Sequence, residues 1–110
     1  MIYLSPSKHD KIISYVSHLP HVVAFSLIQS ITRKNLPFAS GGLKDTTRIA
    51  SSPAELWSDI FLTNAGNVLL AIKGFTKSLS TIKTAVLKKD VRKLQRILRQ
   101  DRTKRQLLNS

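Results

Sequence analysis

The chain has 110 residues, of which 42% are hydrophobic, and it carries a formal net charge of +12. This length and apolar content suffice for a single folded domain over residues 1–110, and they exclude an intrinsically disordered chain. The absence of cysteine excludes disulfides and thiolate metal sites and indicates a reducing compartment. We find no apolar run of the roughly 18–20 residues that a membrane span requires, and therefore expect a cytoplasmic protein that does not contact a membrane.

The positive charge is concentrated in the last third of the chain. From Lys73 onward, twelve basic residues are accompanied by only two acidic ones, whereas the first 72 residues contain six basic and four acidic residues. Such a surface can attract nucleic acid. Between Lys88 and Arg105, however, no aromatic residue is available to stack on bases. We therefore favour a solvated basic helix, with a nucleic-acid-binding or purely structural dimerisation module as the alternative function.

A long helix is predicted after Pro6 and Ser7, with Ser7 as its N-cap, and it extends to about Ile31, because apolar residues cover most of its circumference. A helix of this kind lies in a protein interior. Pro20 lies in its middle and lacks a backbone N–H group, so it predicts a kink or break near Ser17. A break there leaves polar backbone groups free beside His18 and His21, which makes this stretch the first candidate functional segment.

The second candidate segment begins with a turn predicted at Gly41 and Gly42, where glycine would suit a left-handed or flexible backbone. Asp45 and Arg48 follow at a helical spacing. They predict either an exposed ion pair along a helix or an anion-binding arginine, because a guanidinium group can hold a carboxylate through two hydrogen bonds. The residue spacing alone leaves both interpretations open.

Helices also fill the second half of the chain. The run Ser52-Pro53-Ala54-Glu55 predicts a helix start with Ser52 as N-cap, and Trp57 follows as a core or pocket-wall residue. Apolar residues then recur at alternating spacings of four and three, which predicts one helix about 39 Å long that packs in a bundle or a dimer. The members of this seam are Phe61, Ala65, Val68, Ile72, Phe75, Leu79, Ile82 and Val86.

The end of the chain is predicted to form one further helix. Asp90 is expected to cap it, and the basic tail of residues 101–110 is expected to fray. No alternation typical of strands is present, so the predicted fold class is all-α, a helical bundle with long helices.

The residues do not assemble a complete catalytic centre or a metal site. His18 and His21 are three residues apart, but only His9 could add a third imidazole and no carboxylate pair lies nearby, so we interpret them as hydrogen-bonded histidines. The four glycines do not form the G-x-G-x-x-G motif that binds dinucleotides.

At these same residues the sequence resembles the C-terminal helical domain of the prephenate and arogenate dehydrogenases of tyrosine biosynthesis. The resemblance covers about residues 8 to 75. It is carried by five runs: His9-Asp10, Ser17-His18-Leu19-Pro20-His21, Phe38-Ala39-Ser40-Gly41-Gly42, Asp45-Thr46-Thr47-Arg48-Ile49-Ala50 and Trp57-Ser58-Asp59-Ile60-Phe61-Leu62-Thr63-Asn64.

The resemblance implies an NAD- or NADP-dependent oxidoreductase that oxidises and decarboxylates prephenate to 4-hydroxyphenylpyruvate. It also implies an intertwined helical homodimer similar to the C-terminal domain of 6-phosphogluconate dehydrogenase. The Rossmann domain that holds the cofactor is absent from these residues, so we expect this chain to be inactive by itself and to need a separate nucleotide-binding domain.

The resemblance further implies the residues of a substrate pocket for prephenate or arogenate. Arg48 would grip a substrate carboxylate, and His21 and Ser17 would line the pocket. Asp45 would gate the pocket near the dimer boundary, while Trp57 would support its wall. Gly41 and Gly42 would let the backbone approach the substrate closely.

Overall fold

A computed structural model describes residues 4–109, and within that range every regular element is a helix. This confirms the predicted all-α class. The chain forms two compact units, of which the first ends at Ile72 and the second begins at Lys73. All predicted site residues lie in the first unit.

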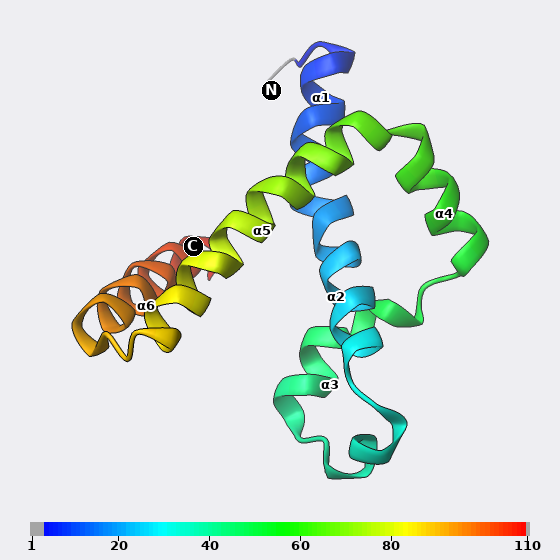
Figure 1. Ribbon diagram of the computed structural model, residues 1–110. Helices are drawn as coiled ribbons and strands as arrows, with labels where there is room; N and C mark the ends of the chain where they lie inside the picture. The colour runs from blue at the N-terminus through cyan, green and yellow to red at the C-terminus, as the bar shows by residue number, and fades with distance from the viewer. Residues whose placement is uncertain (1–3, 110) are drawn as a thin grey trace. The chain divides into compact units, whose positions relative to one another are not determined.

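The first unit is built on a continuous helical run (Figure 1) that comprises α1 (Pro6–Ile13), a π-helical turn (Ser14–His18) and α2 (Leu19–Ser30). The N-cap is Ser5 and not Ser7 as predicted: the Ser5 side chain accepts a hydrogen bond from the Lys8 N–H, and Pro6 occupies the first turn. The break predicted from Pro20 takes the form of the π-helical turn, in which the Leu19 N–H donates to the Ser14 carbonyl five residues earlier. Such turns interrupt α-helices without ending them.

The same run, Pro6–Ser30, is long and apolar enough to cross a membrane by length and composition, with a mean hydropathy of 1.3 in an 18-residue window. The expectation that no stretch approaches this length is therefore wrong. The run reaches it because the π-helical turn keeps α1 and α2 continuous across Pro20. Core helices of water-soluble proteins meet the same criterion, and two histidines near its middle would be costly in lipid.

The segment after α2 contains two short 3-10 helices, Arg33–Phe38 and Arg48–Ser51, on either side of α3 (Gly41–Thr47). Both α3 and the Arg48–Ser51 turn pack against α2. Gly41 and Gly42 are the first two residues of α3, and neither has a positive φ. The predicted left-handed turn is therefore wrong, because the chain enters a regular helix at this point.

The predicted 39 Å helix is interrupted. The structure instead has α4 (Ala54–Thr63) and α5 (Ala65–Leu87), with Asn64 between them in a non-helical conformation. The apolar seam continues through the break at Asn64, so the spacing of the apolar residues does not indicate where the helix is interrupted. The predicted N-cap is also displaced: Pro53 is extended, and the Ser52 hydroxyl instead donates to the Ile49 carbonyl at 2.6 Å, closing the preceding 3-10 turn.

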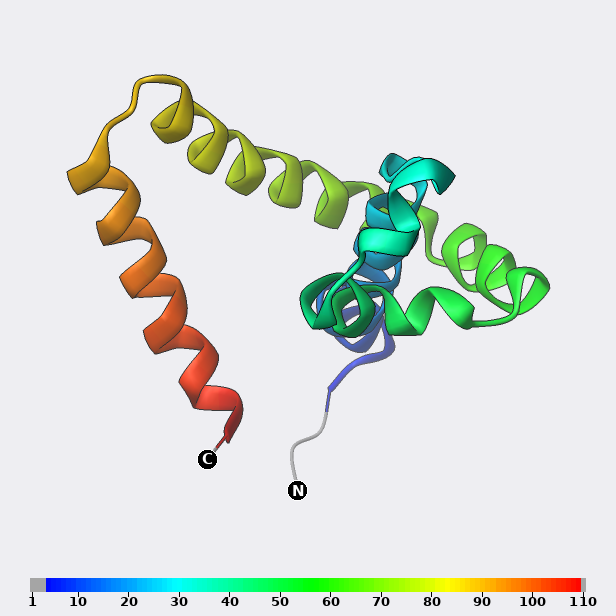
Figure 2. The same cartoon turned by 90° about the horizontal axis from the view of Figure 1, so that it is seen from below.

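The second unit contains the remainder of α5, a tight turn and α6 (Val91–Gln106), which ends in the 3-10 turn Leu107–Asn109 (Figure 2). The turn is a Schellman motif, because the Asp90 N–H donates to the Ala85 carbonyl and the Lys89 N–H to the Val86 carbonyl. Lys89 adopts a positive φ of 51°.

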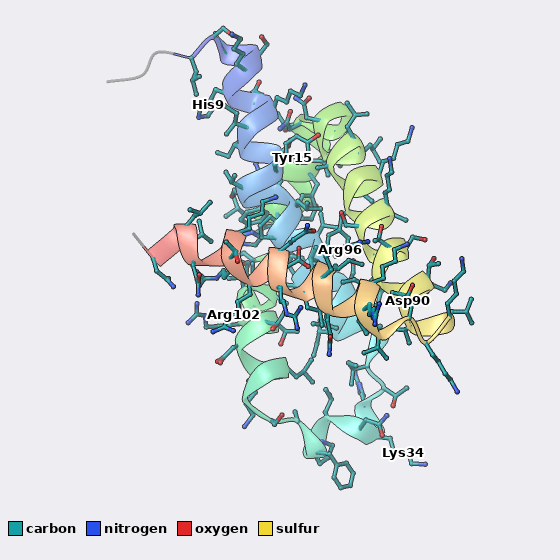
Figure 3. The ribbon with its side chains drawn as sticks, turned by 90° about the vertical axis from the view of Figure 1, so that its left-hand side faces the viewer. His9, Tyr15, Lys34, Asp90, Arg96 and Arg102 are labelled. Atoms are coloured by element: carbon teal, nitrogen blue, oxygen red, sulfur yellow. The ribbon has the colours of Figure 1, made fainter. Side chains whose placement is uncertain are left out.

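Asp90 caps α6 as predicted, since its side chain accepts from the Lys93 N–H at 3.1 Å. The basic tail, for which fraying from residue 101 was predicted, is helical to Gln106 in the structure. Basic side chains in the last turn interact favourably with the helix dipole, and the Arg105 guanidinium also bonds the Asn109 side chain at 3.1 Å. Figure 3 shows Asp90, Arg96 and Arg102 along this helix.

The buried hydrophobic residues of the described chain are few and small, whereas many large ones are exposed. The buried set is Ala24, Val68, Ala71 and Ala85. In the first unit, Leu62 and Leu69 are 75% and 65% exposed. A monomer with so little buried apolar surface is poorly stabilised, which indicates that these residues are covered in the working assembly.

Candidate functional site

The candidate site is centred on the indole of Trp57, which α4 places against the start of α2. The rings of Trp57 and His21 are stacked, with centroids 3.4 Å apart and planes 14° from parallel. The His18 ring meets the same indole edge-on at 6.2 Å and 83°. Two imidazoles, one turn apart on the helical run, therefore share a single aromatic partner.

Further aromatic contacts hold Trp57 in place. Its ring lies 5.7 Å from that of Phe61, one turn later on α4, and Phe61 meets Phe25 of α2 at 6.4 Å in an edge-to-face arrangement. Pairs of this geometry each contribute about 0.5–1.5 kcal/mol beyond the area they bury. The wall of the site is thus part of the packing between α2 and α4.

The His21 ring is oriented by the backbone of the π-helical turn. Its Nδ1 lies 2.9 Å from the Ser17 carbonyl oxygen. Because a carbonyl can only accept, Nδ1 carries the proton and Nε2 is the acceptor in the neutral ring. Ser17 therefore reaches the site through its carbonyl group, one of the polar backbone groups that the predicted break was expected to offer.

His18 is buried, with only 8% of its surface exposed. Burial lowers the pKa of His18 below 6.5, and the neighbouring His21 lowers it further, while the Asp10 carboxylate acts in the opposite direction. The His18 Nδ1 lies 3.4 Å from the side-chain nitrogen of Asn64. His18 is thus a neutral imidazole at neutral pH, packed behind Trp57.

Arg48 begins the 3-10 turn that packs against α2, the helix that also carries His21. Its side chain is exposed, and within residues 4–109 the only ion pair joins His9 and Asp10, which lie on α1 (Figure 3 labels His9). The predicted Asp45–Arg48 ion pair is therefore not formed. A guanidinium group without a carboxylate partner is available to an anion.

The other predicted residues, Asp45, Gly41 and Gly42, lie on α3, which also packs against α2, and all three are exposed. A Cβ atom added to either glycine would meet nothing within 4 Å. Within this chain, therefore, no close backbone approach requires glycine at either position.

The structure brings His21, the Ser17 carbonyl and Trp57 into direct contact, and it places Arg48 on a segment packed against the same helix. The sequence reasoning missed Asn64, whereas the buried His18 agrees with its interpretation as a hydrogen-bonded histidine. The available signal was the polar pair Asn64 and Asn67 within an apolar seam. The described residues contain no group of three histidine, cysteine or acidic side chains able to hold a metal ion.

Two hollows flank these residues in the first unit. A polar hollow of about 350 Å³ lies between α1 and α4 and includes His9, Asp10, His18, Asp59 and Asn64. A larger hollow of about 430 Å³, the apolar groove, is lined by Val22, Phe25, Ser26, Gln29, Phe61, Leu62, Ala65, Val68, Leu69 and Ile72.

Comparison with known proteins identifies the family. Residues 5–100 match the family described as "Prephenate dehydrogenase, dimerization domain". The chain is 39% identical over 101 residues to the prephenate dehydrogenase of Bacillus subtilis strain 168, an alignment that covers 86% of this chain and 27% of the Bacillus protein. The chain belongs to the prephenate dehydrogenase dimerization-domain family.

Solved structures show the same fold. The prephenate dehydrogenase of A. aeolicus, crystallised with hydroxyphenyl propionate and NAD+, is 42% identical and superposes with a TM-score of 0.86 over 97% of this chain and 40% of that one. The arogenate dehydrogenase of Synechocystis is 26% identical, with a TM-score of 0.89 over 98% and 42%. This chain thus spans well under half the length of these relatives, and the comparisons give no support to the nucleic-acid alternative.

Proposed function

We propose that this chain is the helical dimerisation and substrate-binding domain of a dehydrogenase acting on prephenate or arogenate, in the cytoplasm. The match to the dimerization-domain family over residues 5–100 supports the first role. The observation that carries the second is the stack of His21 on Trp57, with the His21 ring locked by the Ser17 carbonyl and Arg48 on a turn packed against the same helix.

In this proposal Arg48 holds a carboxylate of the substrate. Prephenate carries two carboxylates, and a fixed guanidinium group keeps one of them in place while the ring is oxidised and loses carbon dioxide. His21, whose ring is held through Nδ1 by the Ser17 carbonyl, lines the pocket. Trp57 forms the wall, and α3, with Asp45, Gly41 and Gly42, borders the pocket.

The cofactor, NAD or NADP, would be held elsewhere. The described residues contain neither a strand nor a glycine-rich loop of the kind that cradles a dinucleotide, so this chain does not fit the cofactor. When bound to a separate nucleotide-binding domain, the cofactor would accept the hydride. The residues described above would only bind and orient the substrate.

The homodimer is proposed from the exposed apolar surface together with the family match. The apolar groove of the first unit has exposed leucines at its rim and contains few polar groups. A second copy that covered this groove would supply the buried area that the single chain lacks.

Titration calorimetry with prephenate tests the substrate-binding role. Arg48→Ala should weaken binding about 10-fold or more, because charge-assisted hydrogen bonds contribute about 1.5–3 kcal/mol. Lys44→Ala is the matched control, since Lys44 is an exposed cation on the neighbouring helix α3. It removes the same charge and should leave affinity nearly unchanged.

Equal affinities of the wild type and Arg48→Ala would remove Arg48 from the site. If Arg48→Ala and Lys44→Ala lost equal prephenate affinity, the loss would be explained by net charge and not by a specific contact of Arg48. The same titrations should be repeated with a nucleotide-binding domain of this family added in trans, because the substrate pocket is expected to be completed by that domain.

A further inference from the structure

We propose that Asn64 is a positioning residue, which holds His18, the edge-on partner of Trp57, in the tautomer protonated at Nε2. The consequence for a substrate rests on the proposed function. The hydrogen-bond arrangement itself does not.

The side-chain amide of Asn64 has an orientation that its partners determine. Its nitrogen lies 2.8 Å from the Asp10 carbonyl oxygen, which can only accept, so the group there is the NH2. The Asn64 carbonyl oxygen in turn accepts from the Asn67 side chain at 2.9 Å. Both ends of the amide are therefore occupied in a way that forbids the flipped orientation.

This orientation determines the state of His18. The NH2 group has two hydrogens, one of which is used by the Asp10 carbonyl, and the other points to the His18 Nδ1 at 3.4 Å. The contact is long for a hydrogen bond, but its polarity is fixed, because a donor faces Nδ1. His18 Nδ1 must therefore carry a lone pair, which places its proton on Nε2.

His18 and His21 thus adopt opposite tautomers, since His21 is protonated at Nδ1 by its bond to the Ser17 carbonyl. Protonation of His18 would bring an Nδ1–H against the Asn64 NH2. The Asn64 donor therefore favours the neutral form of His18 behind Trp57.

The charged and titratable groups around His18 come from three elements. His9 and Asp10 lie on α1, His21 on α2 and Asp59 on α4, and the polar hollow contains all of these except His21. Burial and His21 oppose a charged His18, while Asp10 favours it. Like burial, the Asn64 donor favours the neutral form of His18. Replacing Asn64 should therefore shift the equilibrium between neutral and protonated His18.

Nitrogen-detected NMR of the histidine rings in the full, ligand-free chain tests the proposal. In the wild type, His18 should show a lone pair at Nδ1 and a proton at Nε2, His21 should show the reverse, and the His18 pKa should lie below 6.5. Asn64→Asp replaces the donor with a carboxylate and should raise the His18 midpoint above its wild-type value.

Asn35→Asp is the matched control, because the substitution introduces the same charge at an exposed position in the Arg33–Phe38 turn. It should leave His18 unchanged. A wild-type His18 protonated at Nδ1, or an Asn64→Asp chain with an unmoved His18 midpoint, would overturn the proposal. The wild-type tautomer needs no variant and decides the matter even where Asn64→Asp fails to fold.

Failure of this proposal and failure of the proposed function are distinguishable. The tautomers are measured without substrate, whereas the substrate-binding role is tested by prephenate titration of the Arg48 variants. If His18 is protonated at Nε2 but the chain does not bind prephenate, Asn64 still positions His18, in a site that serves only the packing of helices.

Discussion

At the scale of single residues, the chain concentrates its buried polar chemistry in the π-helical turn. Ser14 is completely buried, and its hydroxyl donates to the Lys11 carbonyl at 2.5 Å. His18 is buried one turn later and His21 follows on the first turn of α2. These groups stand in an otherwise apolar helix, so each must keep its partner or lose about 1–3 kcal/mol.

The buried His18 makes stability dependent on pH, with a sign that follows from its pKa. The pKa of His18 in the folded chain lies below 6.5, mainly through burial. The unfolded chain therefore binds a proton at pH values where the folded chain does not, and the free energy of unfolding falls as pH drops through about 6.5. The loss levels off below the folded pKa.

Thermal unfolding at a series of pH values between about 7.5 and 5.5 measures this effect. His18→Gln should flatten the profile, because it removes the titrating ring. His9→Gln is the control, since His9 is exposed and its loss should leave the slope in place. A wild-type profile as flat as that of His18→Gln would contradict the assignment.

At the scale of elements, the residues that begin and interrupt helices supported two of the predictions made from the sequence. Asp90 caps α6 as expected, and the effect of Pro20 was located within a few residues. The break at Asn64 was not predicted, because apolar spacing reports which face is buried and continues across a single non-helical residue. At this break the Asn64 side chain donates a hydrogen bond to the carbonyl of Asp10, 54 residues away in the sequence.

The candidate site could be predicted only in part, for a similar reason. The sequence predicted His21, Ser17 and Trp57 as site residues, and the structure brings them into contact. That Ser17 reaches His21 through its carbonyl depends on the backbone of the π-helical turn. His18 and Asn64 gain their roles from a contact between distant segments. Glycine at 41 and 42 indicated a turn, yet both residues start a helix.

The turn between α5 and α6 allows a prediction about stability. Lys89 has a φ of 51° at the position of the Schellman motif where glycine is usual, and a side chain there costs about 1 kcal/mol. Lys89→Gly should therefore raise the free energy of unfolding by up to about 1 kcal/mol.

Lys88→Gly is the matched control for this experiment. Lys88 has no positive φ and bonds the Thr84 carbonyl as the last helical step, so glycine there should destabilise the helix end. Chemical denaturation of both variants measures the difference. A Lys89→Gly chain no more stable than Lys88→Gly would show that the left-handed residue is not strained.

At the scale of the whole molecule, the described chain leaves a large apolar surface uncovered. Its buried hydrophobic residues are one valine and three alanines, whereas leucines along several helices are half exposed or more. This distribution is typical of a subunit whose core is completed by a partner, which agrees with the family to which the chain belongs.

Light scattering after size-exclusion chromatography should therefore find a dimer at micromolar concentration. Leu69→Glu places a charge at the rim of the apolar groove and should shift the protein toward monomer or aggregate, because a buried unpaired charge is costly. Leu36→Glu, outside the groove and 38% exposed, should remain dimeric. A wild-type monomer would refute the interface.

One feature of the site makes the protein easy to observe. Trp57 is the only tryptophan of the chain, and its indole lies flat on His21 with the ring centroids 3.4 Å apart. Ultraviolet-excited emission from this protein therefore comes almost wholly from one ring, in van der Waals contact with the imidazole that an anion would approach. Occupancy of the pocket can be followed by fluorescence in the unlabelled protein, with no dye and no engineered reporter.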